Sequence, residues 1–251
     1  MSGLCSPPPP ANFLKLSFPK PKVLLVTINR EKQRNALPAE AHWEGHGIFS
    51  WFDDEPTLLV AIVTGAGSKA FCAGQDLTEQ ASSRRGPKTA AQLAVLNHPP
   101  TGSSSDMVVA SPQALFGLPE VAVGLYAAAG GLPRLMRIIG LQLASEIAMT
   151  GRRLTAQEAL EYRLVNRVSQ TPQSVFDECL SLATQITSFS PDGIIVTRQG
   201  LREAWDNASV EHATSRTRHE YVNRLIAGEN FKIGVEAFAQ RSKPKWVPSH
   251  L

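Results

Sequence analysis

Apolar residues recur at two different spacings along the chain, and each spacing predicts one kind of element. Residues 22–29 (KVLLVTIN) are rich in β-branched side chains and predict a strand, and residues 58–64 predict a second one. Between these strands, Trp43, Ile48 and Phe52 recur at roughly helical spacing. The order strand, helix, strand predicts a parallel pair of strands joined by a crossover helix.

The rest of the chain changes from strand-rich to helical. Residues 132–149 predict two helices that are divided near Gly140. Thr155, followed three residues later by Glu158, forms a capping-box pattern that predicts the start of a further helix. From residue 172 to 227 the apolar spacing is mostly helical. The pattern therefore predicts an α/β fold whose last third is helical.

The chain of 251 residues is therefore expected to have three consecutive parts. Four consecutive prolines predict a flexible, extended arm over residues 1–20. An α/β core is expected over residues 21–170, and a helical segment over residues 171–251. The length suits one large domain with such appendages.

Composition narrows the class of protein. Hydrophobic residues make up 43% and charged residues 19% of the chain, as in soluble globular proteins. The net charge is only +3, without the basic stripe of a nucleic-acid-binding protein. No apolar run approaches the roughly 20 residues of a membrane span, and the N-terminus does not resemble a secretory signal. Three well-separated cysteines argue against a disulfide framework or a metal cluster, and for a reducing compartment.

The stretch KAFCAGQDL, residues 69–77, leaves a predicted buried strand through a loop of small residues. One interpretation is a turn and nothing more. The other is a backbone N–H, that of Gln75, aimed at a developing negative charge, since fixed backbone amides suit that task. Gly74 would then let the chain pass close to a ligand.

Six segments, in order, resemble the enoyl-CoA hydratase/isomerase (crotonase) superfamily, and specifically a fungal-type peroxisomal member. The segments are INREKQRNAL, VTGAGSKAFCAGQDL, ASPQALFGLPEVAVGL, AAAGGLPRL, MTGRRLTAQEALEYRLVNRV and GVEAFAQRSKPKW. The resemblance implies a crotonase-like spiral of ββα units over the α/β core. It also implies a helical C-terminal segment that builds homotrimers or homohexamers. The implied ligand is an acyl-CoA thioester, with coenzyme A as part of the substrate and no separate cofactor or metal.

The resemblance also implies roles for individual residues. The backbone N–H of Gln75 would stabilise an enolate oxyanion, and Glu120, in FGLPE, would act as general acid or base. Asp76 would brace the turn. The alternative for Glu120 is a surface side chain that begins a loop. The residues implied to contact substrate or CoA are Ala73, Gly74, Gln75, Asp76, Leu77, Lys32, Arg34, Phe238 and Arg241.

The sequence departs from the family pattern at residues 89–105. The family has a buried strand ending in Asn-Gly, then a glycine run and a helix with a second catalytic Glu. In this chain the corresponding segment is shorter, and it contains neither Gly-Gly nor an acidic residue before Asp106. Pro99 and Pro100 have no N–H to donate. A rebuilt site using the Gly102 or Ser103 amide, a deletion and a misread splice junction all remain open.

The sequence therefore leaves two functions open. The first is an active hydratase or isomerase, a lyase-type or isomerase-type enzyme of fatty acid or specialised acyl-CoA metabolism. The second is a degenerate homologue that binds CoA thioesters or partner subunits but lacks the second oxyanion donor and the second Glu. An unrelated α/β binding module is a third class, which the ordered motifs disfavour.

The chain ends in Ser249-His250-Leu251, which matches the peroxisomal address of the Ser-Lys-Leu type. This predicts import into the peroxisome by a receptor that reads the free C-terminus. The alternative is a chance tail, in which case a cytoplasmic or mitochondrial location is expected.

Overall fold

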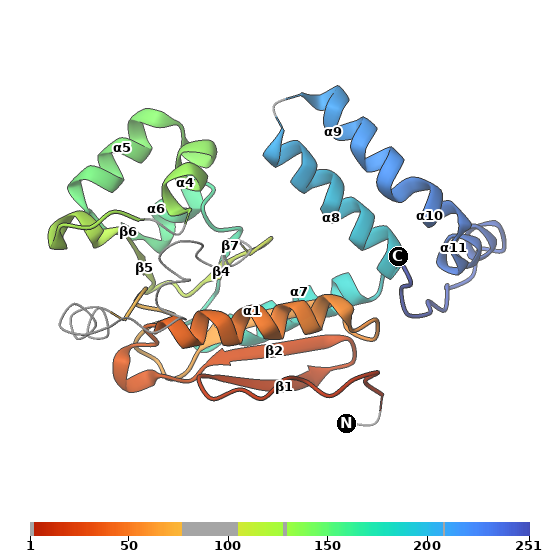
Figure 1. Ribbon diagram of the computed structural model, residues 1–251, viewed down its shortest axis with the longest axis horizontal. Helices are drawn as coiled ribbons and strands as arrows, with labels where there is room; N and C mark the ends of the chain where they lie inside the picture. Colours follow the sequence, from red (N-terminus) through yellow and green to blue (C-terminus); the bar gives the residue numbers. More distant parts are fainter. Residues whose placement is uncertain (1–2, 77–104, 128–129, 208) are drawn as a thin grey trace. The chain divides into compact units, whose positions relative to one another are not determined.

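The computed structural model describes residues 3–76, 105–127, 130–207 and 209–251 (Figure 1). Within these residues one sheet has three strands, in the order β1 (Leu14–Lys20), β2 (Val23–Ile28) and β3 (Val60–Gly65). β1 pairs with β2 antiparallel, and β2 pairs with β3 parallel. Helix α1 (Ala39–Asp54) joins the parallel pair, which confirms the predicted crossover.

The central strand β2 carries the core of this sheet. Val23 and Leu24 are completely buried and Val26 almost so. Such a run of apolar residues without alternation is typical of a strand flanked by neighbours and covered on both faces. This explains why residues 23–28 could be predicted as a strand from their composition alone.

The predicted flexible arm is shorter than expected. Residues 14–20 form β1, so the prediction of an arm over 1–20 is wrong for its last third. The reason is the alternation in LKLSF, which gives Leu14 a buried side chain and lets the segment pair with β2. The start of the chain is also anchored, because the N–H groups of Cys5 and Ser6 donate to Glu55 Oε2 at 2.8 and 3.1 Å.

Two pairs of short strands lie in the middle of the chain. β4 (Val109–Ala110) pairs parallel with β7 (Arg167–Val168), and β5 (Leu115–Phe116) pairs antiparallel with β6 (Leu154–Thr155). The turn η2 (Pro119–Val123), a 3-10 helix, follows β5.

The predicted helices of this region are confirmed. They are α4 (Gly131–Ile139), α5 (Leu141–Thr150) and α6 (Ala156–Glu161). Gly140 separates α4 from α5 with a φ of 80°. The capping box at α6 is complete, because Glu158 N–H donates to Thr155 Oγ1 and Thr155 N–H donates back to Glu158 Oε2. Leu135, Ala144, Ile147 and Leu154 form a buried apolar cluster.

The last third is helical, as predicted. Its helices are α7 (Val175–Thr187), α8 (Pro191–Asp206), α9 (Val210–Thr217), the π-helical turn η3 (Arg218–Val222), α10 (Asn223–Ala227) and α11 (Glu229–Ala239). Ser190 and Ser209 cap α8 and α9 through their hydroxyl groups.

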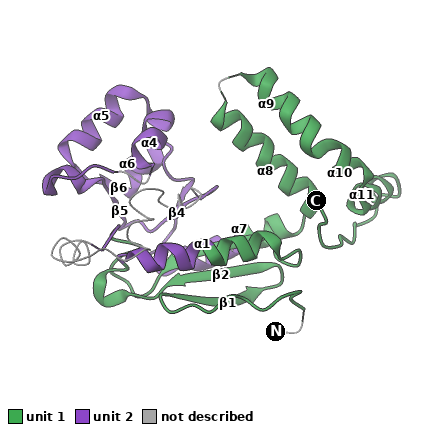
Figure 2. Cartoon of the chain, viewed as in Figure 1, with its two compact units in different colours: residues 1–35, 47–73, 182–251 green, residues 36–46, 74–181 purple. Residues whose placement is uncertain are grey.

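The chain divides into two compact units (Figure 2). Unit 1 comprises Met1–Asn35, Gly47–Ala73 and Leu182–Leu251, and unit 2 comprises Ala36–His46 and Gly74–Ser181. This differs from the predicted three consecutive parts, because the N-terminal sheet groups with the C-terminal helices. Among the described helices, none is long and apolar enough to cross a membrane.

Candidate active site

The loop after β3 is fixed to the segment that precedes α1. Leu37 N–H donates to the Gly74 carbonyl at 2.9 Å, and Asp76 N–H donates to the Leu37 carbonyl at 3.0 Å. These two bonds form a parallel bridge between Leu37 and Gln75. Both bonds use the neighbours of Gln75, so its own N–H takes no part in the bridge. Within the described part of the chain, that N–H has no acceptor, as a donor to a ligand requires.

Asn35 organises the same loop, and sequence reasoning did not assign it this role. Its side chain is buried, with Nδ2 donating to the carbonyls of Ala66 and Ala70 at 2.9 and 2.7 Å. Its Oδ1 accepts the Arg30 N–H at 3.0 Å. No local signal in the sequence marks this role, because it depends on carbonyl groups 31 and 35 residues later in the chain. Asn35 therefore determines the path by which the chain reaches Gln75.

Two glycines make this path possible. A Cβ on Gly65 would lie 2.3 Å from the Phe71 carbonyl oxygen, so any side chain there would displace the loop. Gly74 has a φ of 86°, a left-handed conformation that other residues rarely adopt. Gly74 immediately precedes Gln75, so this conformation directs the N–H of Gln75.

Glu120 lies in η2, directly after Pro119, which begins this short helix. The turn ends at Gly124, and the Leu125 N–H donates to the Glu120 carbonyl at 2.9 Å. The carboxylate is half-buried, and its Oε2 is buried without a hydrogen-bond partner in the described structure. Buried carboxylate oxygens nearly always have a partner, so this oxygen is a candidate for contact with water or a bound ligand.

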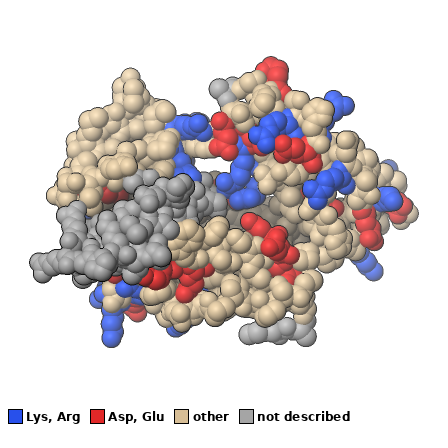
Figure 3. Space-filling model, in the orientation of Figure 1, with Lys and Arg blue, Asp and Glu red and all other residues tan. Residues whose placement is uncertain are grey.

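Glu120 lines a cavity of about 270 Å³ in unit 2. Nine of the twelve described lining residues are apolar, and the other three are Glu120, Tyr126 and Ser145. No Lys or Arg is among them. On the face seen in Figure 3, the surface over α5 is almost without charged side chains. Such a cavity suits the neutral, apolar part of a ligand.

Gln75 is not among the described residues that line this cavity. Both residues belong to unit 2, but their convergence on one reacting carbon stays a prediction. Asp76 is buried, as expected of a residue that braces the turn. Leu77, the segment 89–104 and any second oxyanion donor or Glu within it lie outside the described residues.

The four residues predicted to meet the nucleotide part of CoA, which are Lys32, Arg34, Phe238 and Arg241, lie in unit 1. Lys32 belongs to the 3-10 turn η1 (Glu31–Gln33) that follows β2, and Arg34 ends this turn with a φ of 52°. Both side chains are exposed. On α11, Phe238 is 88% exposed, and Arg241 follows the helix with a φ of 53°. Exposed cations and an exposed ring are compatible with a nucleotide contact, but no described contact joins them into one site.

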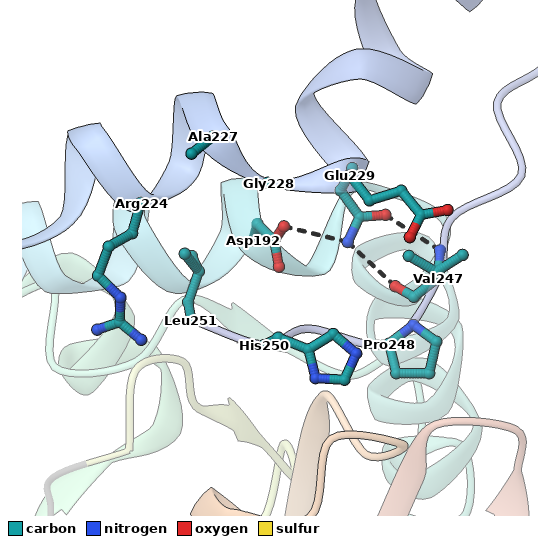
Figure 4. A pocket seen from close by; sticks show the side chains of 10 residues that line it. Asp192, Arg224, Ala227, Gly228, Glu229, Val247, Pro248, His250 and Leu251 are labelled. Carbon is teal, nitrogen blue, oxygen red and sulfur yellow. Dashed lines mark hydrogen bonds between the residues drawn. The ribbon is translucent and has the colours of Figure 1, made fainter.

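A second cavity, of about 290 Å³, lies at the C-terminal tail in unit 1 (Figure 4). Asn230 forms two hydrogen bonds to the C-terminal tail there. Its Nδ2 donates to the Val247 carbonyl at 3.1 Å, and its Oδ1 accepts the Val247 N–H at 3.0 Å. Asn230 Nδ2 also donates to Asp192 Oδ2 at 3.1 Å. His250 and Leu251, two residues of the predicted import signal, line the same cavity.

Within the described ranges, no three His, Cys, Asp or Glu side chains gather closely enough to hold a metal ion. The described cysteines form no disulfide.

Comparison with known proteins relates these features to one family. The chain is 40% identical to mevalonyl-coenzyme A hydratase of Beauveria bassiana over 97% of this chain and 98% of that protein. It is likewise 40% identical to mevalonyl-coenzyme A hydratase of Aspergillus fumigatus over 94% of this chain and 95% of that protein. The first alignment extends over 277 residues, more than this chain of 251 contains, so the relative has residues without a counterpart here.

The fold agrees with the sequence comparison. A crystal structure of enoyl-CoA hydratase from Mycobacterium tuberculosis superposes with a TM-score of 0.81 at 30% identity, covering 94% of this chain and 99% of that one. The family model for enoyl-CoA hydratase/isomerase matches residues 20–99 and 101–248. The chain belongs to the enoyl-CoA hydratase/isomerase family, with the crotonase fold and fungal relatives that act on an acyl-CoA thioester.

Proposed function

We propose that this protein removes water from, or adds water to, the acyl chain of a CoA thioester, with Glu120 as its general acid and base. The observation that carries the proposal is Glu120 Oε2, which is buried without a hydrogen-bond partner among the described residues and belongs to the lining of an apolar cavity of about 270 Å³. A carboxylate oxygen in such surroundings is suited to exchange a proton with a carbon acid.

The chemistry requires two groups on one substrate. In dehydration, Glu120 accepts the proton from C2, and the electron pair of the C2–H bond moves toward the thioester carbonyl. The resulting oxyanion is stabilised by the Gln75 N–H, a donor fixed by the Leu37 bridge before the substrate arrives. The electron pair then returns from the oxyanion to form the C2–C3 double bond, and the C3–O bond breaks. The leaving hydroxyl group takes the proton that Glu120 accepted, so that the products are a 2,3-unsaturated thioester and water.

The names of the two fungal relatives favour mevalonyl-CoA as the substrate. The mevalonyl group has a methyl and a hydroxyl on C3 and a second hydroxyl on C5. Loss of the C3 hydroxyl gives a branched enoyl thioester that keeps the C5 hydroxyl. The apolar lining of the cavity suits the methyl branch, and the absence of Lys and Arg among its described lining residues suits an uncharged acyl chain.

The nucleotide part of CoA carries phosphates, for which Lys32 and Arg34 are the proposed partners. Both are exposed cations close to the end of β2. Phe238, almost fully exposed on α11, is the proposed cover for the adenine, together with Arg241. No further cofactor is proposed.

The second candidate function is a homologue that binds CoA thioesters without turnover. It is motivated by the short segment at 89–105, where the family's second Glu and second oxyanion donor are expected. Losing one oxyanion donor costs about 10²–10³ in rate, so a chain without it would be a weak catalyst.

One experiment separates the two functions. Purified protein is incubated with mevalonyl-CoA, and the unsaturated thioester is quantified by mass spectrometry, with Glu120→Gln as the control. Gln keeps the shape of the side chain and cannot accept the proton. We expect the original protein to turn over at least about 10²-fold faster than the variant. Equal rates, or binding without turnover in both proteins, would favour the non-catalytic homologue.

A homotrimer or homohexamer is the proposed assembly. Leu201, Val210, Val235 and Phe238, in the C-terminal helices, are each more than half exposed. Large apolar side chains in such number are typical of surfaces that subunits cover. Light scattering should give a mass of three or six chains of 27.2 kDa, and a clean monomer at micromolar concentration would contradict this assembly.

Peroxisomal import is proposed from Ser249-His250-Leu251, read by an import receptor that binds the free carboxylate and the basic penultimate side chain. It would place the enzyme in a compartment of acyl-CoA metabolism. The route, fatty acid degradation or a specialised pathway, is set by the substrate.

A further inference from the structure

Few polar side chains line the Glu120 cavity, and Ser145 is one that has no part in the proposed proton transfer. Apart from Glu120, only Tyr126 and Ser145 contribute polar side chains to the described lining. Ser145 lies in the middle of α5, whose lining residues are Leu141, Ala144, Ser145, Ala148 and Met149. These positions recur at the three- and four-residue spacing of one helix face. Ser145 therefore places a hydroxyl group in the centre of an otherwise apolar wall.

The hydroxyl group of Ser145 is available to a ligand. Hydroxyl groups on helices commonly donate to the carbonyl one turn earlier, and Thr150, on the same helix, does so to Glu146 at 2.6 Å. Ser145 has no such bond and no other partner among the described residues. The side chain is half-buried, and its oxygen is not among the buried atoms that lack a partner, so solvent reaches it. A ligand that displaces this solvent leaves the hydroxyl group at a cost in free energy unless the ligand itself supplies a hydrogen bond.

The chemistry of the cavity selects the kind of partner. A carboxylate or phosphate on the acyl chain would meet Glu120 without a cation among the described lining residues. A plain alkyl chain would fill the apolar wall and leave the Ser145 hydroxyl group without a partner. A neutral hydroxyl group on the acyl chain satisfies both requirements, because Ser145 can donate to it or accept from it.

We infer that Ser145 determines specificity by binding a hydroxyl group on the distal part of the acyl chain, so that the protein prefers hydroxylated acyl-CoA to the plain alkyl analogue. This rests on the proposed function only in that the acyl chain occupies the Glu120 cavity. In mevalonyl-CoA the partner is the C5 hydroxyl, which is present before and after dehydration. Ser145 thus contributes to binding in the ground state and takes no part in proton transfer.

The test uses two saturated probes that cannot be hydrated or dehydrated, 5-hydroxypentanoyl-CoA and pentanoyl-CoA. Calorimetry measures their dissociation constants with the original protein, with Ser145→Ala and with the matched control Gln142→Ala. Gln142 is exposed on the same helix and is not among the described lining residues. We expect the original protein and Gln142→Ala to prefer the hydroxylated probe by about 3- to 10-fold, the range of one neutral hydrogen bond. Ser145→Ala should lose that preference and keep its affinity for pentanoyl-CoA.

Two outcomes would overturn the inference. One is a preference for the hydroxylated probe that survives in Ser145→Ala, or that disappears in Tyr126→Phe instead. The other is the absence of any preference, or of binding, in the original protein. The proposed function fails separately, because a Ser145-dependent preference without turnover of mevalonyl-CoA would leave this inference standing and exclude the hydratase.

Discussion

Glu120 and Gln75 are held by backbone geometry at different points of unit 2. Glu120 is fixed by the 3-10 turn that begins at Pro119, and Gln75 by two hydrogen bonds of its neighbours to Leu37. Both could be singled out from the sequence, because their motifs are local. Asn35 could not, since its role depends on carbonyls 31 and 35 residues later that only the fold brings to it.

The proposed role of Gln75, stabilisation of the oxyanion, is carried by its backbone N–H and not by its side chain. This predicts different effects for two substitutions at this position. Gln75→Ala keeps the N–H and should retain turnover within about 3-fold, if the amide is the oxyanion donor. Gln75→Pro removes the N–H without removing a bond of the bridge, and should lower kcat by about 10²–10³.

The measurement is steady-state turnover of mevalonyl-CoA, accompanied by the melting temperature of each variant. A Gln75→Pro protein that melts like the original and turns over equally fast would show that this amide is not the donor.

At the scale of elements, the predictions succeeded where signals are local and failed where pairing is distant. The two helices separated by Gly140 and the capping box at Thr155 follow from residues within a turn of each other. β1 was missed because a proline run precedes it and its partner β2 supplies the stabilising contacts. A short strand is predicted at residues 106–110 and is confirmed by β4, but its pairing with the two-residue strand β7 could not be predicted, because 56 residues separate Ala110 from Arg167.

The link between the N-terminal arm and Glu55 predicts a dependence on pH. Glu55 is 1% exposed, and burial alone would raise its pKa, but hydrogen bonds from Thr57, Ser6 and Cys5 lower the pKa below its ordinary value. A carboxylate with a lowered pKa stabilises the fold above the unfolded pKa of about 4.3, and this stabilisation is lost as the pH falls through the folded pKa.

Glu55→Gln should therefore lower the free energy of unfolding by about 1–3 kcal/mol at neutral pH. The difference between variant and original should shrink as the pH falls through the lowered pKa of Glu55, because the original then loses its charge. Urea unfolding at several pH values measures it. A difference that is constant from pH 7 to pH 3 would contradict the charged role of Glu55.

For the whole molecule, the sequence predicted the family and the α/β-then-helical order, whereas the grouping into two units needed the structure. The N-terminal sheet and the C-terminal helices lie in one unit although more than a hundred residues separate them. Nothing local in the sequence encodes that grouping, because it depends on which apolar faces pack together after the helices have formed.

The two hydrogen bonds of Asn230 to Val247 predict how the proposed import signal behaves in the folded chain. The three residues of that signal, Ser249, His250 and Leu251, follow Val247 closely. Asn230→Ala removes both bonds to the tail, so carboxypeptidase should release Leu251 faster from the variant than from the original protein. The control is Asn207→Ala, a substitution at the end of α8 that does not contact the tail in any described hydrogen bond.

Deleting Leu251 from a fluorescent fusion tests the signal itself. The deletion should leave the fusion in the cytosol, because the receptor reads the terminal residues. Fluorescent puncta that persist after the deletion would place the signal elsewhere. In the carboxypeptidase experiment, equal rates for Asn230→Ala and the original protein would show that Asn230 does not restrain the tail.

The central claim, that Glu120 exchanges a proton with C2 of an acyl-CoA thioester, is tested most directly by hydrogen exchange. Mevalonyl-CoA is incubated in D₂O with the original protein or with Glu120→Gln, and deuterium at C2 is followed by mass spectrometry. We expect the original protein to incorporate deuterium, and the variant to do so at a rate lower by about 10²–10⁴. Equal incorporation in both, or none in either, would contradict it.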